Sequence, residues 1–323
     1  MEASARIAGA GGADAVSRVL GLDTSNYKTS VAWFNGVTGE NAGRLLEVPA
    51  GALGLRQSEA LFQHVRRLPD LALELEGDLR DVVAVGASTQ PREEEGSYMP
   101  CFLAGASQAR VLARILNVPF CAVSHQQGHV AAAAWSAGHT ELLDVPHLAW
   151  HLSGGTTELL VVEPEGPLPR CRRIGGTTDL AAGQLIDRAG QKLGLAFPAG
   201  PALEALAAQA DRELCFPVKT KDGYFSLSGM ENQVERLLAE GETPANIARF
   251  VLNTLADVIV RTTRQALQSE SRPVLCSGGV AANRLLRGAM EQNCGAVFGE
   301  ARYAGDNALG VAVLTYRMWE ARS

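Results

Sequence analysis

The order of apolar segments and polar turns occurs twice along this chain of 323 residues, and that repetition constrains the fold more than any other feature. Each half is predicted to open with a short apolar strand, a small polar turn, a return strand and a third strand, followed by strand–helix units. The opening segments are residues 19–25 and 28–34 in one half, and 147–157 and 158–162 in the other. We interpret this as duplication of one α/β unit, although a single large α/β domain with chance similarity would also fit.

The rest of the pattern predicts mixed sheets covered by helices. Further strands are predicted over 44–48, 81–87, 119–123, 170–174 and 273–276. Helices are predicted over 58–75, 102–116 and 308–320. Residues 1–17 are small and rich in Gly and Ala, without the apolar stretch of a signal peptide, so we expect a disordered leader.

Charge and composition narrow the classes of function. The formal net charge is −6, so the chain is not expected to grip a nucleic-acid backbone strongly by itself. An RNA substrate would need a local basic patch or a partner subunit. No apolar run is long enough to span a bilayer, so no membrane partner is expected. The six cysteines include no C-x-x-C pair, which favours free thiols in a cytoplasmic protein.

Three small polar turns follow predicted buried strands and suit an anion such as phosphate, because their backbone N–H groups are unobstructed. They are Asp23-Thr24-Ser25, the turn at 153–157 and Ser277-Gly278-Gly279. Gly278 and Gly279 permit close approach of a ligand, and Asn283 could hydrogen-bond a ribose or a base. One such turn often only joins two elements, but repeated turns at matching positions of a duplicated fold favour a nucleotide site.

His125 and His129 follow the strand predicted to end at Val123. On a helix they would lie one turn apart on one face, where two imidazoles can bind one metal ion. The alternative is a pair of histidines with ordinary hydrogen bonds. A zinc peptidase is disfavoured, because Gln126 occupies the position where that class needs a glutamate base.

Two carboxylates, Asp179 and Asp187, lie in one predicted helical segment. Asp179 is predicted to cap the helix, and Asp187 would follow two turns later, where the pair could contact a ribose or a metal-bound water. The alternative is a capped helix with one solvated charge. Asp306 precedes the C-terminal helix and would be its N-cap.

The order of these motifs resembles the tRNA N6-threonylcarbamoyladenosine transferase family, formerly classed as glycoproteases of peptidase family M22. The likeness runs from about residue 19 to about residue 316. It is carried by LGLDTS (20–25), HQQGH (125–129), LSGGTTEL (152–159), DLAAGQLIDRAGQKLGLAFPAGP (179–201), FSLSGMENQV (225–234), CSGGVAANR (276–284) and GDNALGVA (305–312).

The resemblance implies a duplicated, ribonuclease H-like α/β fold of the actin-like ATPase type, with two lobes and a central nucleotide cleft. We assign residues 18–126 and 305–323 to lobe I and residues 127–304 to lobe II. It also implies one divalent metal ion, iron or zinc, held by His125, His129 and Asp306. The implied nucleotide ligand is ATP, ADP or threonylcarbamoyl-adenylate. The implied contacts to the adenylate are Leu152, Ser153, Gly154, Gly155, Thr156, Asp187, Gly200 and Asn283, to which the residues themselves add Gly278 and Gly279.

The implied activity is metal-dependent transfer of a threonylcarbamoyl group from its adenylate to N6 of an adenosine in tRNA. The implied partners are tRNA, a related inactive paralogue and a small ATPase, and a dimer is one assembly we consider. Two alternatives stay open at this point. One is a divergent, non-catalytic nucleotide-binding subunit of a modification complex. The other is a phosphotransferase on the same fold, with Asp23 or Asp179 as its base.

The chain departs from the family pattern at five carboxylate positions. Tyr27 and Lys28 replace an acidic pair, Gln127 replaces a glutamate between the two histidines, and Leu180 and Gln184 replace two more acidic residues. The residues at 90–100 also replace a glycine-rich loop. The cleft is therefore expected to be less negative than in the family, as in a paralogue with altered chemistry.

Overall fold

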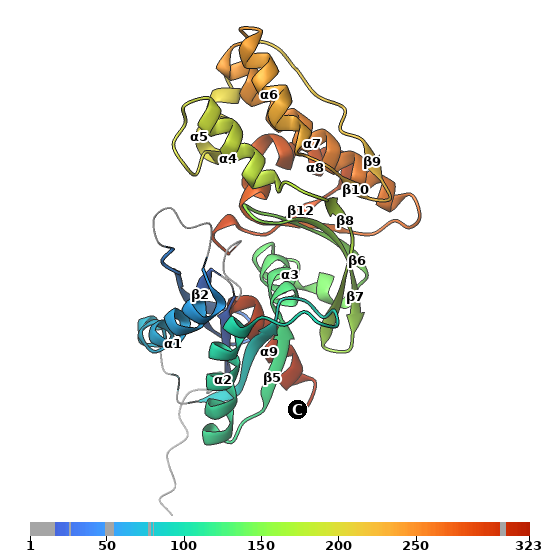
Figure 1. Cartoon of the computed structure of the whole chain (residues 1–323). Helices are drawn as coiled ribbons and strands as arrows, with labels where there is room; N and C mark the ends of the chain where they lie inside the picture. The colour runs from blue at the N-terminus through green and yellow to red at the C-terminus, as the bar shows by residue number, and fades with distance from the viewer. Residues whose placement is uncertain (1–16, 26, 49–54, 77–78, 80, 304–307) are drawn as a thin grey trace, which may run out of the picture.

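The computed structural model describes residues 17–25, 27–48, 55–76, 79, 81–303 and 308–323. It consists of two sheets with helices on and between them, arranged as two lobes one above the other in Figure 1. The predicted leader, apart from residue 17, and the predicted ligand Asp306 lie outside the described residues.

The first sheet has five strands in the order β3-β2-β1-β4-β5. They are β1 (Arg18–Thr24), β2 (Lys28–Phe34), β3 (Gly39–Leu45), β4 (Val82–Gln90) and β5 (Phe120–Ser124). The first three strands pair antiparallel, and β4 and β5 run parallel to β1. The third strand begins five residues earlier than predicted, because its polar start at Gly39 and Glu40 gives no apolar signal.

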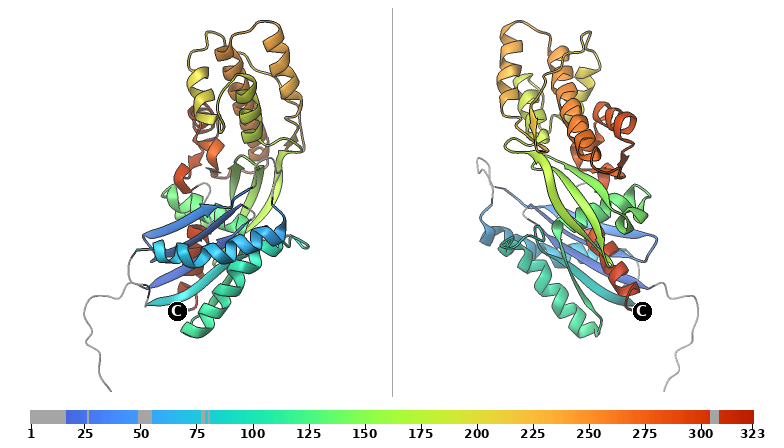
Figure 2. Two further views of the ribbon diagram at one scale, coloured as in Figure 1. Left: turned by 60° about the vertical axis from the view of Figure 1, so that its left-hand side comes forward. Right: turned by 90° about the vertical axis from the view of Figure 1, so that its right-hand side faces the viewer.

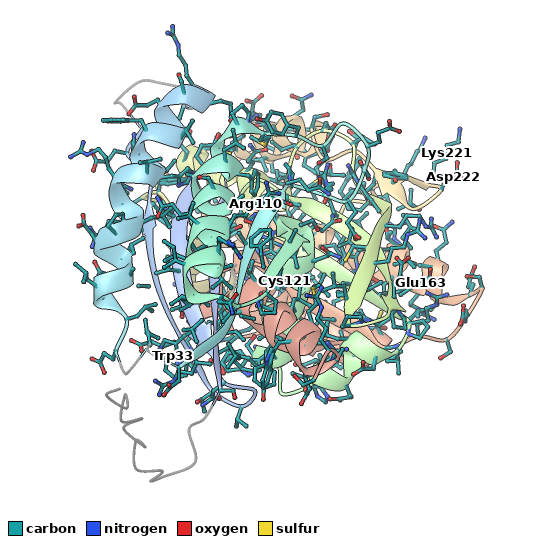
Figure 3. The ribbon with its side chains drawn as sticks, turned by 90° about the horizontal axis from the view of Figure 1, so that it is seen from below. Trp33, Arg110, Cys121, Glu163, Lys221 and Asp222 are labelled. Atoms are coloured by element: carbon teal, nitrogen blue, oxygen red, sulfur yellow. The ribbon has the colours of Figure 1, made fainter. Side chains whose placement is uncertain are left out.

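The second sheet repeats this order as β8-β7-β6-β11-β12 and adds a small hairpin beyond β8. Its strands are β6 (His147–Leu152), β7 (Thr157–Glu165), β8 (Leu168–Thr177), β11 (Val274–Ser277), β12 (Val297–Phe298), and the hairpin strands β9 (Thr220–Lys221) and β10 (Tyr224–Phe225). Lys221 and Asp222 lie at the turn of this hairpin, at the edge of the sheet (Figure 3). Equal strand order in the two halves confirms the predicted duplication.

Helices form three layers around the sheets (Figure 2). One side of the first sheet packs on α1 (Gln57–Glu74) and α2 (Leu103–Leu116). Between the sheets lie α3 (His125–Ser136) and α9 (Ala308–Glu320). The far side of the second sheet is covered by α4 (Ala182–Lys192), α5 (Gly200–Ala207), α6 (Gly229–Ala239), α7 (Pro244–Leu267) and α8 (Arg284–Cys294). Within the described residues, no helix is both long and apolar enough to cross a membrane.

Small residues let α3 and α9 approach each other at the level of the backbone. A Cβ added at Gly310 of α9 would overlap the carbonyl of Gly128 of α3, so alanine cannot fit there without a shift of one helix. Ala131, Ala133 and Ala312 are buried in the same layer. Helix α3, which carries both predicted metal-binding histidines, is therefore packed closely against α9 between the lobes.

The apolar face of α1 includes a histidine. Ala60, His64, Leu68 and Leu71 recur at helical spacing, and all four are buried. The Nδ1 atom of His64 lies 2.8 Å from the hydroxyl oxygen of Thr29 in β2. Burial lowers the pKa of His64 from 6.5 to about 4, so the imidazole is uncharged in the folded protein at neutral pH.

Acidification should therefore destabilise the fold through His64. Its pKa is lower in the folded than in the unfolded chain, so the unfolded chain binds the proton first. The stabilisation is complete above pH 6.5 and is lost as the pH falls toward 4, by up to about 3 kcal/mol. Urea unfolding at pH 7 and pH 4.5 should show a smaller loss for His64→Gln than for the wild type. Equal losses would refute this role, since the other buried histidines contribute alike to both proteins.

Candidate functional site

A large cavity lies in lobe II and has a volume of about 890 Å³. It is bounded by the turn between β6 and β7, by α4 and α5, and by the segment that leads from β11 into α8. Five of the predicted nucleotide contacts line it: Gly154, Asp187, Gly200, Gly279 and Asn283. Gly154, Gly200 and Gly279 have open space where a side chain would stand, so a ligand can approach their backbone closely.

The start of α4 packs directly on the turn between β6 and β7. A Cβ at Gly183 would lie 2.6 Å from the Cα of Gly154, and the Gly183 N–H donates to the carbonyl of Ser153 at 3.2 Å. The hydroxyl of Thr157 accepts from the N–H of Ala182 at 2.8 Å. Glycine at 183 is thus required for the contact that fixes the turn at the edge of the cavity.

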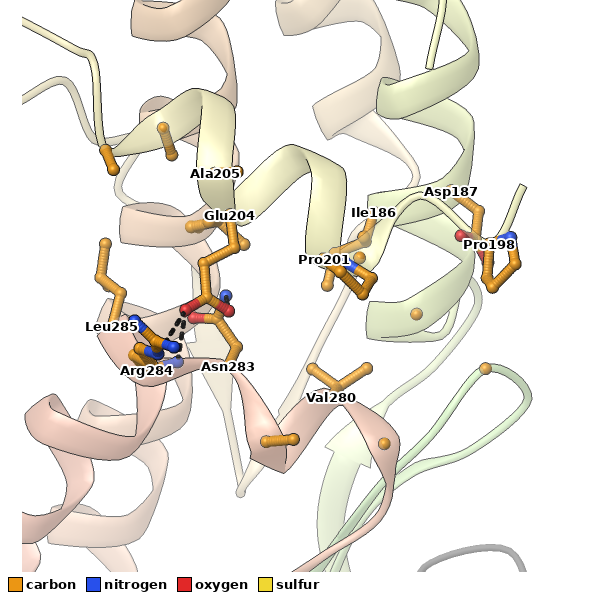
Figure 4. Close-up of a pocket in the computed structure, with 18 of the residues that line it drawn as sticks. Ile186, Asp187, Pro198, Pro201, Glu204, Ala205, Val280, Asn283, Arg284 and Leu285 are labelled. Atoms are coloured by element: carbon orange, nitrogen blue, oxygen red, sulfur yellow. Dashed lines mark hydrogen bonds and ion pairs between the residues drawn. The ribbon is translucent and has the colours of Figure 1, made fainter. Parts of the chain in front are cut away.

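Hydrogen bonds hold the polar side chains on the wall of this cavity. One oxygen of Asp187 accepts the Ala199 N–H at 2.8 Å, which ties α4 to the start of α5. The oxygen of Asn283 caps α8 by accepting the Leu286 N–H, and its amide donates to Glu204 at 3.0 Å. Figure 4 shows Glu204 and Asn283 facing each other across the cavity wall. Glu204 was not predicted from the sequence.

The other predicted nucleotide contacts lie beside this cavity. Leu152 is buried at the end of β6, and Ser153 and Gly155 belong to the turn that follows it. Thr156 lines a second cavity. Gly278 packs on the carbonyl of Leu152 with a φ of +98°, a backbone conformation suited to glycine.

The second cavity is smaller, about 310 Å³, and is lined by both lobes. Three imidazoles form part of its wall: His125 and His129 from α3 and His151 from β6. The ring centroids of His125 and His129 are 4.6 Å apart, and those of His129 and His151 are 4.2 Å apart. The helical pair predicted from the sequence therefore lies side by side in this wall, and its role as a metal site stays a prediction.

Helix α3 begins at His125 because its N-terminus is closed by two reciprocal hydrogen bonds. The Ser124 hydroxyl accepts the Gln127 N–H at 3.2 Å, and the Gln127 side chain accepts the Ser124 N–H at 2.7 Å. The Gln127 amide also donates to the carbonyl of Pro169 at 2.8 Å, a bond that an ionised glutamate could not make. The change from glutamate at this position thus has a structural explanation.

Asp23 lies behind His125 rather than in the cavity. Its carboxylate is 1% exposed and lies 3.1 Å from Nδ1 of His125, with a second bond from the Ser88 hydroxyl. Burial alone would raise the pKa of Asp23, but His125 and the hydroxyl bonds outweigh it and lower the pKa below its usual value. The ionised carboxylate orients the imidazole, as carboxylates do behind metal-binding histidines.

Burial lowers the pKa of the other two imidazoles of the cavity, those of His129 and His151. The pKa of His129 falls well below 6.5 through burial, with smaller effects from His151, His125 and Lys28. The pKa of His151 falls to about 4, again mainly through burial. His151 has no paired histidine spacing in the sequence and was not predicted as a site residue. The sequence signal for His151 is the alternation of side chains along a strand. Leu148, Trp150 and Leu152 pack into one core, so His151 lies on the opposite face, toward α3.

The histidine pair has the chemistry to bind a metal ion. The third predicted ligand, Asp306, lies outside the described residues. Neutral imidazoles are ligands for zinc and iron, and Asp23 presets the ring of His125. Within the described part of the chain, no three or more His, Cys, Asp or Glu side chains are grouped so as to hold a metal ion. The described residues therefore offer two of the three predicted ligands.

Asp179 lies away from the histidines and is not the cap of α4, whose N-cap is Ala181. Its carboxylate accepts from the Leu227 N–H at 2.9 Å and the Ser226 hydroxyl at 2.5 Å. Although burial opposes it, these hydrogen bonds hold the pKa of Asp179 well below its usual range. Such a carboxylate is a weak base, and its contacts join the segment before α4 to the one before α6.

Comparison with known proteins decides the family. The family model for tRNA N6-adenosine threonylcarbamoyltransferase matches residues 60–313. This chain belongs to the tRNA N6-adenosine threonylcarbamoyltransferase family. The family member from Thermus thermophilus is 34% identical over 282 residues, which cover 83% of this chain and 82% of that protein. The member from Parasynechococcus marenigrum is 30% identical over 335 residues, covering 95% of this chain and 92% of that protein.

Solved structures place this family member in the actin-like ATPase fold, as the resemblance implied. The nucleotide-bound structure of full-length HypF superposes with a TM-score of 0.59 at 15% identity, covering 94% of this chain and 56% of that one. Component A of (R)-2-hydroxyglutaryl-CoA dehydratase from Acidaminococcus fermentans gives a TM-score of 0.57 at 17% identity, covering 94% and 99%. At such identities the likeness concerns the fold alone.

Proposed function

We propose that this chain transfers a threonylcarbamoyl group from its adenylate to N6 of adenosine in tRNA. One observation carries the proposal: the two cavities border the same two glycine turns. Gly154 lines the large cavity and Thr156 the histidine cavity, and likewise Gly279 lines the large cavity and Ser277 the histidine cavity. A donor with a nucleotide at one end and a small acyl group at the other matches this pair of spaces.

In this proposal the large cavity holds the adenosine and the turns hold the phosphate. Asn283, Glu204 and Asp187 supply hydrogen-bonding groups for ribose and base. The unobstructed backbone at Gly154 and Gly279 suits the phosphate. The carbamoyl end enters the histidine cavity, beside His125 and His129.

The transfer forms a C–N bond from the adenosine N6 to the carbamoyl carbon and breaks the C–O bond to the adenylate, with release of AMP and a proton. A divalent metal held by His125, His129 and Asp306 would supply a Lewis acid that favours this exchange. Asp23 orients His125, and apolar side chains such as Val130 and Leu275 limit the water that could hydrolyse the donor. We propose iron or zinc as the metal.

The acidic net charge supports a need for partners. With a formal charge of −6, the chain itself offers little attraction for a tRNA backbone, so we propose that partner proteins present the tRNA. The cytoplasm, where tRNA is found, is the proposed location. The phosphotransferase alternative needs a carboxylate base, and Asp23 and Asp179 are both held by several hydrogen bonds.

Calorimetric titration with three nucleotides tests the proposal at the level of binding. Threonylcarbamoyl-adenylate fills both cavities and AMP only one, so the donor should bind about tenfold more tightly than AMP, or better. ATP is the third nucleotide titrated, because a phosphotransferase on the same fold would use it. Equal affinity for donor and AMP would contradict the proposal. Release of ADP that depends on one metabolite would instead support a phosphotransferase.

A further inference from the structure

The histidine cavity carries more positive than negative charge. Its two charged lining residues are Arg92, from the loop after β4, and Glu158, from β7. The Glu158 carboxylate is 6% exposed and also pairs with Arg173 of β8, whose Nη1 lies 3.4 Å away. Two guanidinium groups therefore share one carboxylate, which leaves an excess of one positive charge at this wall.

Among the described residues, no carboxylate besides that of Glu158 lines the cavity. The Asp23 carboxylate is paired with His125 on the side away from the cavity. An anion is thus the ligand that the cavity favours electrostatically.

Arg92 and Arg173 differ in the number of hydrogen-bond acceptors that contact their guanidinium groups. Arg173 also donates to the carbonyls of Thr177 at 2.7 Å and Gly175 at 3.3 Å. Among the described residues, the guanidinium of Arg92 is paired with Glu158 alone. A guanidinium has five N–H donors in a planar fork, so Arg92 keeps donors for a ligand in the cavity that it lines.

The loop that carries Arg92 is fixed to both lobes. The carbonyl of Pro91 accepts the Gln126 N–H at 3.0 Å, which ties the loop to the start of α3. The Glu93 carboxylate accepts the Cys171 N–H of β8 at 3.0 Å, and the Arg92 N–H donates to the Ser97 hydroxyl at 3.1 Å. Arg92 is therefore held in place before any ligand binds, which reduces the entropy lost on binding.

We propose that Arg92 binds the carboxylate of the acyl group and selects donors that carry one. This rests on the proposed function, in which the acyl group is threonine joined through its nitrogen to the carbamoyl carbon, with its carboxylate left ionised. Arginine pairs with carboxylates through two parallel N–H···O bonds. A volume of about 310 Å³ lies at the small end of ligand pockets, which suits an amino-acid-sized group rather than a nucleotide.

The test compares two donors on the metal-loaded protein by calorimetry. One is threonylcarbamoyl-adenylate, and the other is the same molecule with the threonine carboxylate converted to a primary amide. Arg92→Gln should weaken binding of the carboxylate donor about 10- to 100-fold and that of the amide donor less than about threefold. Arg92→Lys should retain part of the preference. Arg44→Gln, which removes an exposed arginine paired with Glu74, is the matched control and should change neither affinity.

An equal loss for both donors in Arg92→Gln would overturn the inference, because a purely structural link between Arg92 and Glu158 would act on both alike. So would a wild type that binds the two donors equally. Thermal unfolding of each variant checks the fold, and Arg92→Lys gives the same comparison if the glutamine variant unfolds. Selective binding of the carboxylate donor without transfer to tRNA would contradict the proposed function but support the role of Arg92. Transfer to tRNA without such selectivity would support the proposed function and contradict the role of Arg92.

Discussion

Replacing His129 with alanine should lower threonylcarbamoyl transfer by about two to three orders of magnitude while the protein stays folded. The imidazole faces the histidine cavity, 4.6 Å from the ring of His125 and 4.2 Å from that of His151. If this pair holds the metal, its loss removes the group that stabilises charge developing on the reacting carbamoyl oxygen. Loss of one such stabilising group typically costs 10²–10³ in rate. The measurement is kcat/KM with the donor and tRNA, together with elemental analysis of protein purified without chelator.

The matched control for His129→Ala is His139→Ala. His139 follows the C-terminal end of α3, and its imidazole is paired with Glu141. It does not line the histidine cavity, so its removal should leave rate and metal content unchanged. If His129→Ala kept the full rate and the full metal content, the histidine pair could not be the chemical centre of this protein.

Gly278→Ala should destabilise the fold by about 2–6 kcal/mol, a large fraction of the stability of an ordinary domain. Gly278 has a φ of +98°, which strains a residue with a side chain by about 1–3 kcal/mol. The added methyl would also overlap the carbonyl of Leu152 at the end of β6, and such overpacking costs about 1–3 kcal/mol more. Urea unfolding at neutral pH measures the sum.

The neighbouring glycine is the control for this variant. Gly279 has open space where its Cβ would stand and lines the large cavity. Gly279→Ala should therefore change the free energy of unfolding by less than about 1 kcal/mol and act instead on nucleotide affinity. Equal destabilisation by the two variants would mean that the strained contact with Leu152 does not govern the stability of this turn.

Local patterns in the sequence predicted the duplicated sheets and the histidine pair. The pair was accessible because helical spacing alone places His125 and His129 on one face. His151, Arg92, Glu158 and Glu204 were missed. Pairing of β6 with β11, docking of the loop after β4 onto Glu158 and the contact of α5 with Asn283 bring them to the cavities. Those contacts are tertiary and leave no local spacing to find.

The prediction that Asp179 caps α4 was wrong for a related reason. An aspartate before a helix usually caps it, but here the N–H of Leu227 and the hydroxyl of Ser226 donate to its carboxylate, and α4 begins three residues later. Competition from a distant segment decided the outcome. Asp306 stays a prediction, because it lies outside the described residues.

The most direct measurement follows a labelled threonine. Threonylcarbamoyl-adenylate carrying isotope in the threonine is mixed with the metal-loaded chain, partner proteins and unmodified tRNA, and the nucleosides are analysed after digestion. If the two cavities hold the two ends of one donor, label should appear on N6 of adenosine in step with the release of AMP. Absence of labelled adenosine with every partner combination, while the donor still binds, would contradict transfer and leave a nucleotide-binding subunit.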